Sequence, residues 1–369
     1  MFNTIAAHAV SAIFLGTIGY FTYSCIGCFY LALTGLGFFF YIVYLLGNYV
    51  DNALPRFRVT ATNKAVFITG CDKGFGRMLA RRLDSMGYKV FAGCLDPDGE
   101  EAKKLKDTIS SHLEVIPLDV TKISSIQNAL KTVENKLGNY EFWAVVNNAG
   151  VIERGELEWT PLELYRQQFE VNTFGVVSVT QAFLPLLRKF KGRVVTMVSV
   201  GGRHTFSGFV PYCMSKHAVT SFCDGLRLEM KKFGVKVVTV EPFSYQTDMT
   251  EMKTVLKSIE NTWEKCSTQL KNDVYDADYM KAFSDCVRKF NESTALPHIE
   301  RVIDLLVEAV CAISPHYSYV PGNTESLLNL WLSKRAPKTL VDYFVRKKVT
   351  FDCDLEEHLK EKEIKKKNS

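Results

Sequence analysis

Two side chains that can exchange protons stand one helical turn apart in the second half of the chain. Tyr212 and Lys216 are four positions apart, so on a helix both project from the same face. A tyrosine phenol has an ordinary pKa of about 10, and a neighbouring ammonium lowers that pKa because it favours the phenolate. The pair therefore predicts proton exchange with an alcohol or a carbonyl, in which Tyr212 is the acid and the base.

A glycine-rich loop near position 70 is the second feature that could support chemistry. It reads Gly70-Cys71-Asp72-Lys73-Gly74-Phe75-Gly76. Glycines let the backbone turn sharply and approach a pyrophosphate closely, and the N-terminus of a following helix offers unpaired N–H groups. The loop stands between a β-branched run and a helical pattern, so it predicts a site for the phosphates of a dinucleotide.

The elements that must position these residues follow from the apolar pattern. Short β-branched runs predict strands at residues 65–69, 89–94, 113–118, 143–146, 193–199 and 235–240. Longer segments between them have helical periodicity, for example residues 78–86 and 123–137. Apolar strands that alternate with helices predict an α/β fold, a doubly wound parallel sheet covered on both faces. Its ligand should lie beyond the carboxyl ends of the strands.

Further residues recur at fixed intervals around the same two features. They are Asp119, Asn148, Ala149, Gly150, Asn172, Ser199, Pro242 and Thr247. With the glycine loop and the Tyr212–Lys216 pair, they resemble the short-chain dehydrogenase/reductase family, densely over residues 64 to 250 and more loosely to 350. The resemblance implies a Rossmann-type catalytic domain that binds NAD or NADP and needs no metal.

The resemblance also implies a role for each matching residue. Tyr212 is the acid/base, Lys216 lowers its pKa and binds the ribose, Ser199 positions the substrate oxygen, and Asn172 supports the proton relay. The implied cofactor-binding residues are Gly70, Asp72, Lys73, Gly74, Phe75, Gly76, Asp119, Asn148, Ala149, Gly150, Pro242 and Thr247. Among these, Asp119 faces the adenine and Thr247 touches the carboxamide.

Two positions leave alternatives open. Asp72 could repel a 2′-phosphate and so favour NAD, whereas Lys73 is a base where NADP-preferring relatives often carry one; we expect NAD. Phe243 stands where the family usually has glycine after Pro242. If that turn needs a positive φ, phenylalanine reshapes the nicotinamide side of the pocket; otherwise the turn does not need glycine.

Strings within the match indicate a branch of the family. Residues 69–72, 91–95, 183–187 and 192–195 resemble 17β-hydroxysteroid dehydrogenase type 2, 11β-hydroxysteroid dehydrogenase type 2, retinol dehydrogenases and D-3-hydroxybutyrate dehydrogenase. The implied activity interconverts a secondary alcohol and a ketone on a small apolar substrate, steroid or retinoid-like. The predicted apolar lining of its pocket comprises Phe206, Phe209, Val210, Phe243, Tyr245, Met249, Met252 and Trp263.

Two rival functions remain at this point. Oxidation of 3-hydroxybutyrate would need a cation for the substrate carboxylate, and Arg203 and His204 are the candidates near Ser199. A non-catalytic, dinucleotide-sensing membrane protein is the other rival, although mere binding would not require Tyr212. The family also leads us to expect a homodimer through the helices that bear Asn172 and Tyr212.

The first fifty residues carry no charged side chain, because the first is Asp51. As one helix, residues 4–49 would span about 65–70 Å, roughly twice a hydrocarbon core of about 30 Å. We therefore expect two membrane spans, with one span plus an interfacial segment as the alternative. Basic residues after the leader, Arg56 and Arg58, predict a cytosolic body. Lys366 and Lys367 resemble a dilysine signal, which predicts the endoplasmic reticulum membrane.

The remaining composition is that of a globular protein. The chain has 369 residues, is 47% hydrophobic and carries a formal net charge of +5, which excludes global disorder and gives no support for a nucleic-acid partner. Ten scattered cysteines show no zinc spacing. The expected domains are a leader at 1–50, a linker at 51–62, the core at 63–250, a helical substrate lid with the last strand and helices at 251–350, and a charged tail at 351–369.

Overall fold

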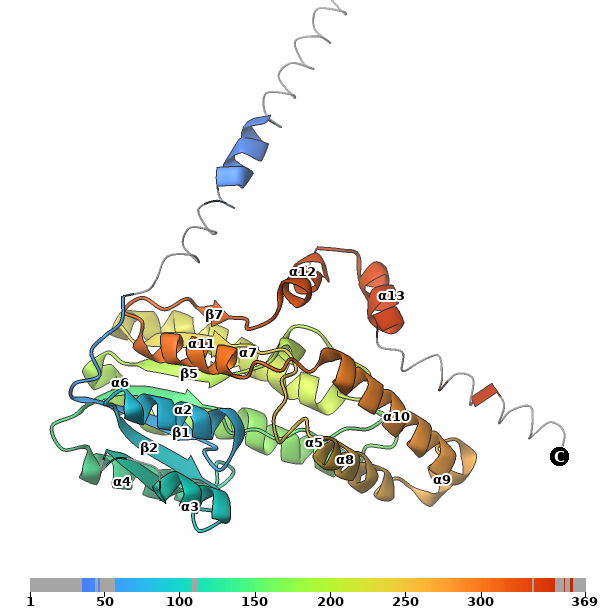
Figure 1. Ribbon diagram of the computed structural model, residues 1–369, viewed down its shortest axis with the longest axis horizontal. Coiled ribbons are helices and arrows are strands. Elements are labelled where there is room, and N and C mark those ends of the chain that lie inside the picture. The colour runs from blue at the N-terminus through green and yellow to red at the C-terminus, as the bar shows by residue number, and fades with distance from the viewer. Residues whose placement is uncertain are drawn as a thin grey trace, which may run out of the picture. The chain divides into compact units, whose positions relative to one another are not determined.

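The structure, a computed structural model, describes residues 35–43, 46, 57–107, 110, 112–333, 335–348, 355 and 359–360. The chain divides into two units, residues 1–56 and 57–369. In the first unit, residues 35–43 are helical (Figure 1). No helix among the described residues has both the length and the apolar character needed to cross a membrane. Most of the predicted leader, and the pair Lys366–Lys367, lie outside the described residues.

A seven-stranded parallel sheet forms the centre of the second unit. Its strand order is β3-β2-β1-β4-β5-β6-β7, and every neighbouring pair is parallel. The strands are β1 (Lys64–Thr69), β2 (Lys89–Cys94), β3 (Leu113–Pro117), β4 (Glu141–Asn147), β5 (Arg193–Met197), β6 (Lys236–Val240) and β7 (Ser318–Tyr319). The order reverses between β1 and β4, so the ligand edge predicted for a doubly wound sheet lies at their carboxyl ends.

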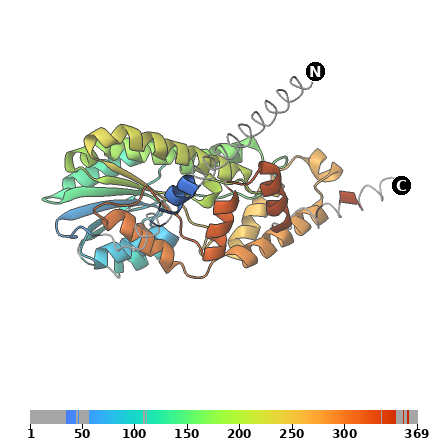
Figure 2. The same cartoon turned by 90° about the horizontal axis from the view of Figure 1, so that it is seen from above.

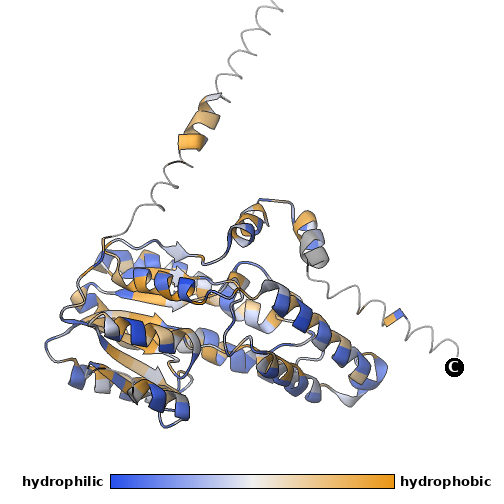
Figure 3. Ribbon diagram, viewed as in Figure 1, coloured by the Kyte–Doolittle hydropathy of each residue, from blue (hydrophilic) through white to orange (hydrophobic). Residues whose placement is uncertain are grey.

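Helices cover both faces of this sheet (Figure 2). One face packs against α2 (Gly74–Ser85), α3 (Glu100–Asp107) and α11 (Glu300–Cys311), which bury Leu79, Leu105 and Leu306. The other face packs against α4 (Ile123–Leu137), α6 (Gly175–Phe190) and α7 (Val210–Met230), which bury Val133, Phe183 and Val219. Hydrophobic residues are accordingly concentrated in the strands, whereas the helices carry both hydrophobic and hydrophilic residues (Figure 3). The predicted doubly wound α/β sheet is confirmed.

Three helices after β6 form a smaller core of their own. They are α8 (Met252–Glu264), α9 (Thr268–Asp273) and α10 (Ala277–Thr294). Ile259 of α8 and Phe283 of α10 are buried against Trp159, which lies between β4 and α5 (Leu162–Phe169). The chain then returns to the sheet through α11 and β7, so the predicted lid region also completes the core.

Two further helices, α12 (Thr324–Ser333) and α13 (Lys338–Lys348), follow β7. Their exposed apolar side chains include Leu328, Trp331, Leu332, Leu340 and Tyr343.

The predicted strand at residues 193–199 is two residues too long. The strand ends at Met197, and Ser199 instead caps a short 3₁₀ helix at Val200–Gly202, where its Oγ accepts a hydrogen bond from the Gly201 N–H at 3.0 Å. A serine hydroxyl that bonds to nearby backbone competes with strand pairing in this way. The turn leaves Ser199 at the carboxyl end of β5.

Candidate active site

The glycine loop joins β1 to α2 at the ligand edge of the sheet. Gly70 (φ +69°) and Gly74 (φ +59°) hold left-handed conformations that other residues rarely adopt. A Cβ at Gly76 would lie 2.3 Å from the Gly70 carbonyl oxygen and 2.5 Å from Nδ2 of Asn148. The Lys73 side chain forms no capping hydrogen bond with α2, so the N–H groups of its first turn can face a phosphate.

The predicted residues after β4 hold this loop in place. Thr69 Oγ1 accepts hydrogen bonds from the N–H groups of Asn148 and Ala149, both at 3.0 Å. In return, Asn148 Nδ2 donates to the carbonyls of Thr69 and Gly70, both at 2.9 Å. Asn148 and Ala149 therefore shape the loop through its backbone.

Asp72 connects the loop to the end of β2. Its carboxylate accepts hydrogen bonds from the N–H groups of Leu95 (3.1 Å) and Asp96 (2.9 Å). It therefore places a negative charge at the end of β2, where NAD enzymes often carry an acid for the ribose hydroxyls. Lys73 is exposed, and the Phe75 ring meets the ring of buried Tyr245, with their centres 6.5 Å apart.

Asp119 lies in the turn after β3. Its Oδ1 accepts hydrogen bonds from the N–H (3.0 Å) and Oγ1 (2.6 Å) of Thr121, and Oδ2 pairs with Lys122 at 3.1 Å. Partial burial raises the pKa of Asp119, but these hydrogen bonds and the Lys122 charge lower it further, so the net shift is downward. The Asp119 carboxylate thus stays ionised and shapes its own turn.

A cavity of about 490 Å³ joins the glycine loop to the segment after β6. Its lining includes Gly74 and Arg77 of α2, Thr247 and Asp248 after β6, and Asn291 of α10. The cavity begins at the helix N-terminus after the glycine loop, where a phosphate group of a dinucleotide is favoured. Two predicted contact positions, Gly74 and Thr247, therefore share one cavity.

Phe243 does not have the backbone conformation that would require glycine. Among the described residues, only Asn63 and Lys191 have a positive φ without being glycine. The Phe243 ring lies against Gly322, where a Cβ would come within 2.7 Å of two ring carbons. The small residue that makes room is therefore Gly322, and the turn after Pro242 does not need glycine.

The structure brings Tyr212 and Ser199 together from α7 and from the turn after β5. The Ser199 hydroxyl is close enough to lower the pKa of Tyr212, and Ser199 Oγ lies 3.5 Å from the Pro242 carbonyl oxygen, to which it can donate. Gly201 passes beside the tyrosine, since a Cβ there would lie 3.3 Å from its Cε1. The side chains of Tyr212 and Ser199 therefore lie close together at the carboxyl edge of the sheet.

Lys216 and Asn172 lie beneath this pair. Lys216 is buried, its Nζ donates to the Met197 carbonyl at 3.0 Å, and it lies 5.7 Å from the centre of the Tyr212 ring. A Cβ at Gly150 would be 3.4 Å from Asn172 Oδ1 and 3.7 Å from Lys216 Nζ. The Asn172 amide and the Lys216 ammonium thus both lie next to Gly150.

Asn172 is fully buried in a π-helical turn, Glu170–Phe174, between α5 and α6. Its Oδ1 accepts from the Val151 N–H at 2.8 Å, and its Nδ2 donates to the Val151 carbonyl at 2.9 Å and to Ser215 Oγ at 3.0 Å. The apolar pattern of the sequence does not predict this π turn. Such single turns occur frequently at functional sites, and this one carries the amide toward α7.

Burial dominates the proton equilibria of the pair. Burial raises the pKa of Tyr212 to about 12, although the Ser199 hydroxyl and the charge of Arg154 lower it. Burial lowers the pKa of Lys216 to about 8. The protein's own residues therefore do not produce the low tyrosine pKa expected from the sequence. At neutral pH the phenol is protonated and Lys216 is mostly an ammonium.

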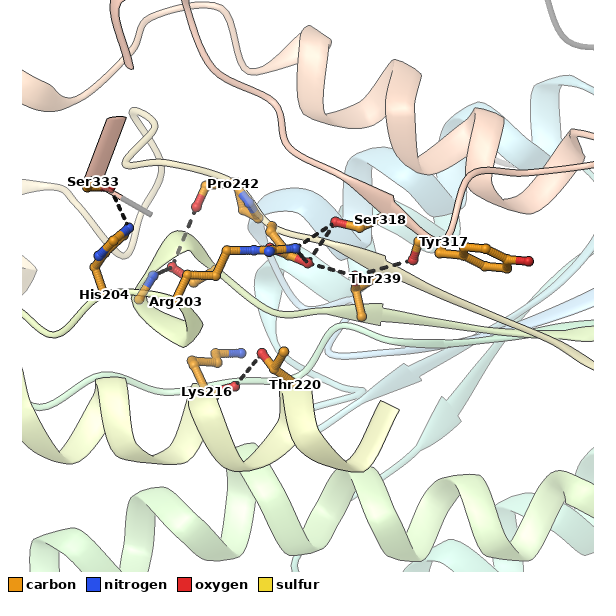
Figure 4. A network of polar contacts seen from close by, with 12 residues as sticks. Arg203, His204, Lys216, Thr220, Thr239, Pro242, Tyr317, Ser318 and Ser333 are labelled. Atoms are coloured by element: carbon orange, nitrogen blue, oxygen red, sulfur yellow. Dashed lines mark hydrogen bonds and ion pairs between the residues drawn. The ribbon is translucent and has the colours of Figure 1, made fainter. Parts of the chain in front are cut away.

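Arg203 and His204, the candidates for a substrate carboxylate, are already engaged (Figure 4). Arg203 forms an ion pair with buried Glu241; its Nη2 donates to Glu241 Oε1 at 2.7 Å and to Ser318 Oγ at 3.1 Å. His204 Nε2 lies 2.9 Å from Ser333 Oγ, within hydrogen-bond distance. These contacts connect the Ser199 turn to β6, β7 and α12. Because Arg203 is already paired with Glu241, it is not available to the carboxylate of 3-hydroxybutyrate.

Only some of the residues predicted to form the apolar lining of the substrate pocket lie together. The rings of Phe206 and Phe209 lie 6.3 Å and 6.1 Å from that of Phe290 on α10, which places α10 over the segment between Ser199 and Tyr212. Trp263 instead donates its indole N–H to the Tyr275 carbonyl at 2.9 Å and packs in the α8–α10 core.

Sequence reasoning missed two charged residues of this region, Arg154 and Glu241. Both are buried, at 4% and 1% exposure. Two signals in the sequence were available: Arg154 follows the Asn147–Gly150 motif closely, and Glu241 ends an apolar strand. Charged residues are seldom buried without a partner or a role.

Comparisons of the sequence agree with this arrangement. The family model described as short chain dehydrogenase matches residues 64–285. Retinol dehydrogenase 7 of Mus musculus is 37% identical over 82% of this chain and 95% of its own length. The 17-beta-hydroxysteroid dehydrogenase type 6 of Bos taurus is 37% identical over 83% and 96%, and estradiol 17-beta-dehydrogenase 2 of Mus musculus is 38% identical over 77% and 74%.

Solved structures share the fold. A short-chain dehydrogenase/reductase of Burkholderia phymatum in complex with NAD has a TM-score of 0.61 at 21% identity and covers 75% of this chain and 94% of its own. A short chain dehydrogenase of Burkholderia cenocepacia in complex with NADP has a TM-score of 0.57 at 18% identity, over 78% and 99%. The parallel sheet, the glycine loop and the matched sequence lead to one assignment: this chain belongs to the short-chain dehydrogenase family and is an NAD(P)-dependent oxidoreductase.

Proposed function

We propose that this chain interconverts a secondary alcohol and a ketone on an apolar, steroid or retinoid-like substrate, at a membrane. The observation that carries the chemistry is the grouping of Tyr212, Ser199 and buried Lys216. A Cβ at Gly201 would lie within 3.4 Å of both Tyr212 Cε1 and Ser199 Oγ, and Lys216 Nζ lies 5.7 Å from the centre of the Tyr212 ring. The names of the relatives, retinol and hydroxysteroid dehydrogenases, support the substrate class. The cytosolic body, the domain bounds and the endoplasmic reticulum location expected from the sequence belong to the same proposal.

The four side chains have different tasks in this mechanism. The Ser199 hydroxyl holds the substrate oxygen, and the Tyr212 hydroxyl gives a proton to that oxygen in reduction or takes one in oxidation. The Lys216 ammonium favours the phenolate and binds the ribose, and Asn172 holds the relay that returns the proton toward Lys216. The nicotinamide coenzyme, when bound, supplies or accepts the hydride.

The proposed coenzyme site is the glycine loop together with Asn148, Ala149 and the cavity that reaches Thr247. NAD is the proposed coenzyme, because the Asp72 carboxylate lies against the backbone at the end of β2, where a 2′-phosphate would meet its charge. Lys73 is exposed and can face solvent.

A homodimer through α7 and the turn that bears Asn172 is also part of the proposal. Phe174 and Met214 on these elements are 54% and 47% exposed. Apolar side chains exposed on adjacent helices are typical of interfaces.

A coenzyme fluorescence assay on the detergent-solubilised protein tests the activity. NAD and NADP are each offered with steroid alcohols, retinols and 3-hydroxybutyrate, and Tyr212→Phe is the matched variant. We expect turnover of an apolar alcohol with NAD, and a loss of about 10²–10⁴-fold in the variant while coenzyme affinity is kept. A variant that keeps more than about a tenth of the rate would refute the role of Tyr212. Coenzyme binding without turnover of any alcohol would favour the dinucleotide-sensing protein.

A further inference from the structure

Arg154 is a buried cation that the mechanism above does not use. It lies four residues beyond Gly150 in the segment after β4 and is 4% exposed. Its Nη2 donates to the Met249 carbonyl at 3.0 Å, and its backbone N–H donates to Ser258 Oγ at 3.2 Å. Its Nη1 is buried and has no hydrogen-bond partner within the part of the chain that the structure describes.

The guanidinium lies among segments that follow the carboxyl ends of the strands. Arg154 follows β4, and Met249 follows β6. The ring of Phe209, in the segment between Ser199 and Tyr212, is centred 5.8 Å from the guanidinium carbon. The Gly155 N–H also donates to the Gly208 carbonyl at 3.0 Å. Segments that follow the carboxyl ends of neighbouring strands surround the ligand in such sheets.

Arg154 also has an electrostatic effect on the Tyr212 hydroxyl. Its charge lowers the pKa of Tyr212, and a charged Tyr212 or Glu153 raises that of Arg154. Burial lowers the pKa of Arg154 to about 10, so the guanidinium remains a cation at neutral pH. Glu153 has a hydrogen-bond partner of its own, because its Oε2 accepts from Ser258 Oγ at 3.0 Å.

A buried N–H group without a partner costs free energy, and more so when it carries charge. A ligand oxygen that arrives with the substrate would remove this cost. We propose that Nη1 of Arg154 binds a second oxygen of the substrate, beside the carbon whose oxygen Tyr212 serves. The inference rests on the proposed function and narrows it. The substrate class becomes an apolar secondary alcohol with a carbonyl or carboxylate oxygen close to the carbinol.

Three probes of matched chain length separate the possible acceptors. In 3-hydroxydodecanoate the carbinol is near a carboxylate, in its methyl ester it is near a neutral carbonyl, and 2-undecanol has no second oxygen. The ratio of kcat/KM for each acceptor-bearing probe to that for 2-undecanol is measured with the full chain and NAD. Because each ratio is taken within one protein, a change in the folded fraction cancels.

We expect the wild-type ratio to exceed about tenfold, with the carboxylate above the ester, because a charge-assisted hydrogen bond is the stronger one. Arg154→Gln should bring both ratios close to one. Loss of the Arg154 charge also raises the pKa of Tyr212, so alcohol oxidation should slow by a common factor for all three probes, which the ratios cancel. Arg154→Lys, which keeps the charge, should retain part of the preference for the carboxylate. If Arg154→Gln does not fold, the lysine variant still shows whether the ester ratio falls.

A binding measurement keeps the two proposals separable. 3-Hydroxydodecanoate is titrated by calorimetry into the NAD-saturated Tyr212→Phe protein, with Arg154 intact or replaced by glutamine. Arg154-dependent affinity in a protein whose wild type turns over none of the three probes and none of the steroid alcohols or retinols would retain the acceptor site and refute the proposed activity. Turnover with unchanged ratios would retain the activity and refute the acceptor site. If Arg154→Gln lowered kcat/KM by the same factor for all three probes and shifted the pH profile, the acceptor site would also be refuted. The role of Arg154 would then be the effect of its charge on Tyr212.

Discussion

At the reacting hydroxyl, burial and charge act on the proton in opposite directions. Burial raises the pKa of Tyr212 to about 12, while Ser199 and Arg154 lower it. Burial also lowers the pKa of Lys216 to about 8. Both groups therefore hold their protons near neutral pH, and the site starts in the state that gives a proton to a ketone.

This state sets the direction of a pH effect. Alcohol oxidation needs the phenolate, whose fraction rises about tenfold per pH unit below its pKa. We expect kcat/KM for oxidation to rise from about pH 6 to about pH 8, whereas ketone reduction, which uses the phenol, should not rise over that range. Paired pH profiles of the two directions on one substrate check this. An oxidation rate that falls with pH would contradict it.

Glu241 offers a residue-scale test of stability. It is 1% exposed, and its carboxylate contacts Arg203, Ser318 and Thr239. Glu241→Ala removes one half of a buried pair, so we expect a loss of about 3 kcal/mol in the free energy of unfolding. Urea unfolding measures it.

The matched control is Asp285→Ala, which removes the exposed partner of Arg288. It should cost less than about 1 kcal/mol. Equal losses in the two variants would show that burial of Glu241 contributes nothing.

Sequence reasoning found the residues that lie close together along the chain and missed those that meet only in space. Tyr212 and Lys216 share one helix, and Asn148 follows one strand, so spacing alone could identify them. Arg154 meets Phe209 and Met249 from two other segments. No local pattern contains that contact, so its chemistry needed the structure.

At the scale of elements, the glycine loop shows how a backbone conformation serves a site. Gly70 combines a positive φ with a close approach, since a Cβ there would lie 2.8 Å from the Ala149 Cα. We expect Gly70→Ala to weaken coenzyme binding at least tenfold and to lower stability by more than about 2 kcal/mol, because both strain and a clash act. Fluorescence titration with NAD and thermal unfolding measure the two effects.

Gly138 is the control for the loop. Its φ is +58° after α4, yet a Cβ there would meet no atom within 4 Å. Gly138→Ala should cost about 1 kcal/mol and leave coenzyme affinity unchanged. If both variants bind NAD like the wild type, the loop does not hold the coenzyme.

The strands and helices with strong periodicity were predictable, and the irregular elements were not. β2 and α4 begin and end where their apolar patterns do. The π turn around Asn172 and the 3₁₀ turn after Ser199 depend on side chains that bond to backbone, a competition that periodicity does not reveal. The two irregular turns carry Asn172 and Ser199, while Tyr212 and Lys216 lie on the regular helix α7.

At the scale of the molecule, the leader gives the membrane proposal its test. Residues 1–50 contain no charged side chain, and the body from residue 57 is a separate unit. We expect the full chain to float with lipid vesicles at high salt, because apolar anchoring is not screened, and a chain of residues 57–369 to stay in solution.

Floating of the shorter chain would contradict the leader as anchor. It would direct attention to α12 and α13, whose exposed Trp331 and Tyr343 are suited to an interface.

The late position of β7 has a consequence for synthesis on the ribosome. Every proposed catalytic residue has emerged by Lys216, but the edge of β6 stays uncovered until Ser318 and Tyr319 arrive. Ser318 also brings a hydrogen bond to buried Glu241. A nascent chain therefore holds a complete set of reacting groups on a sheet that still exposes an unpaired strand, the kind of edge that recruits other chains. Premature termination anywhere before this strand should yield aggregates rather than a smaller enzyme.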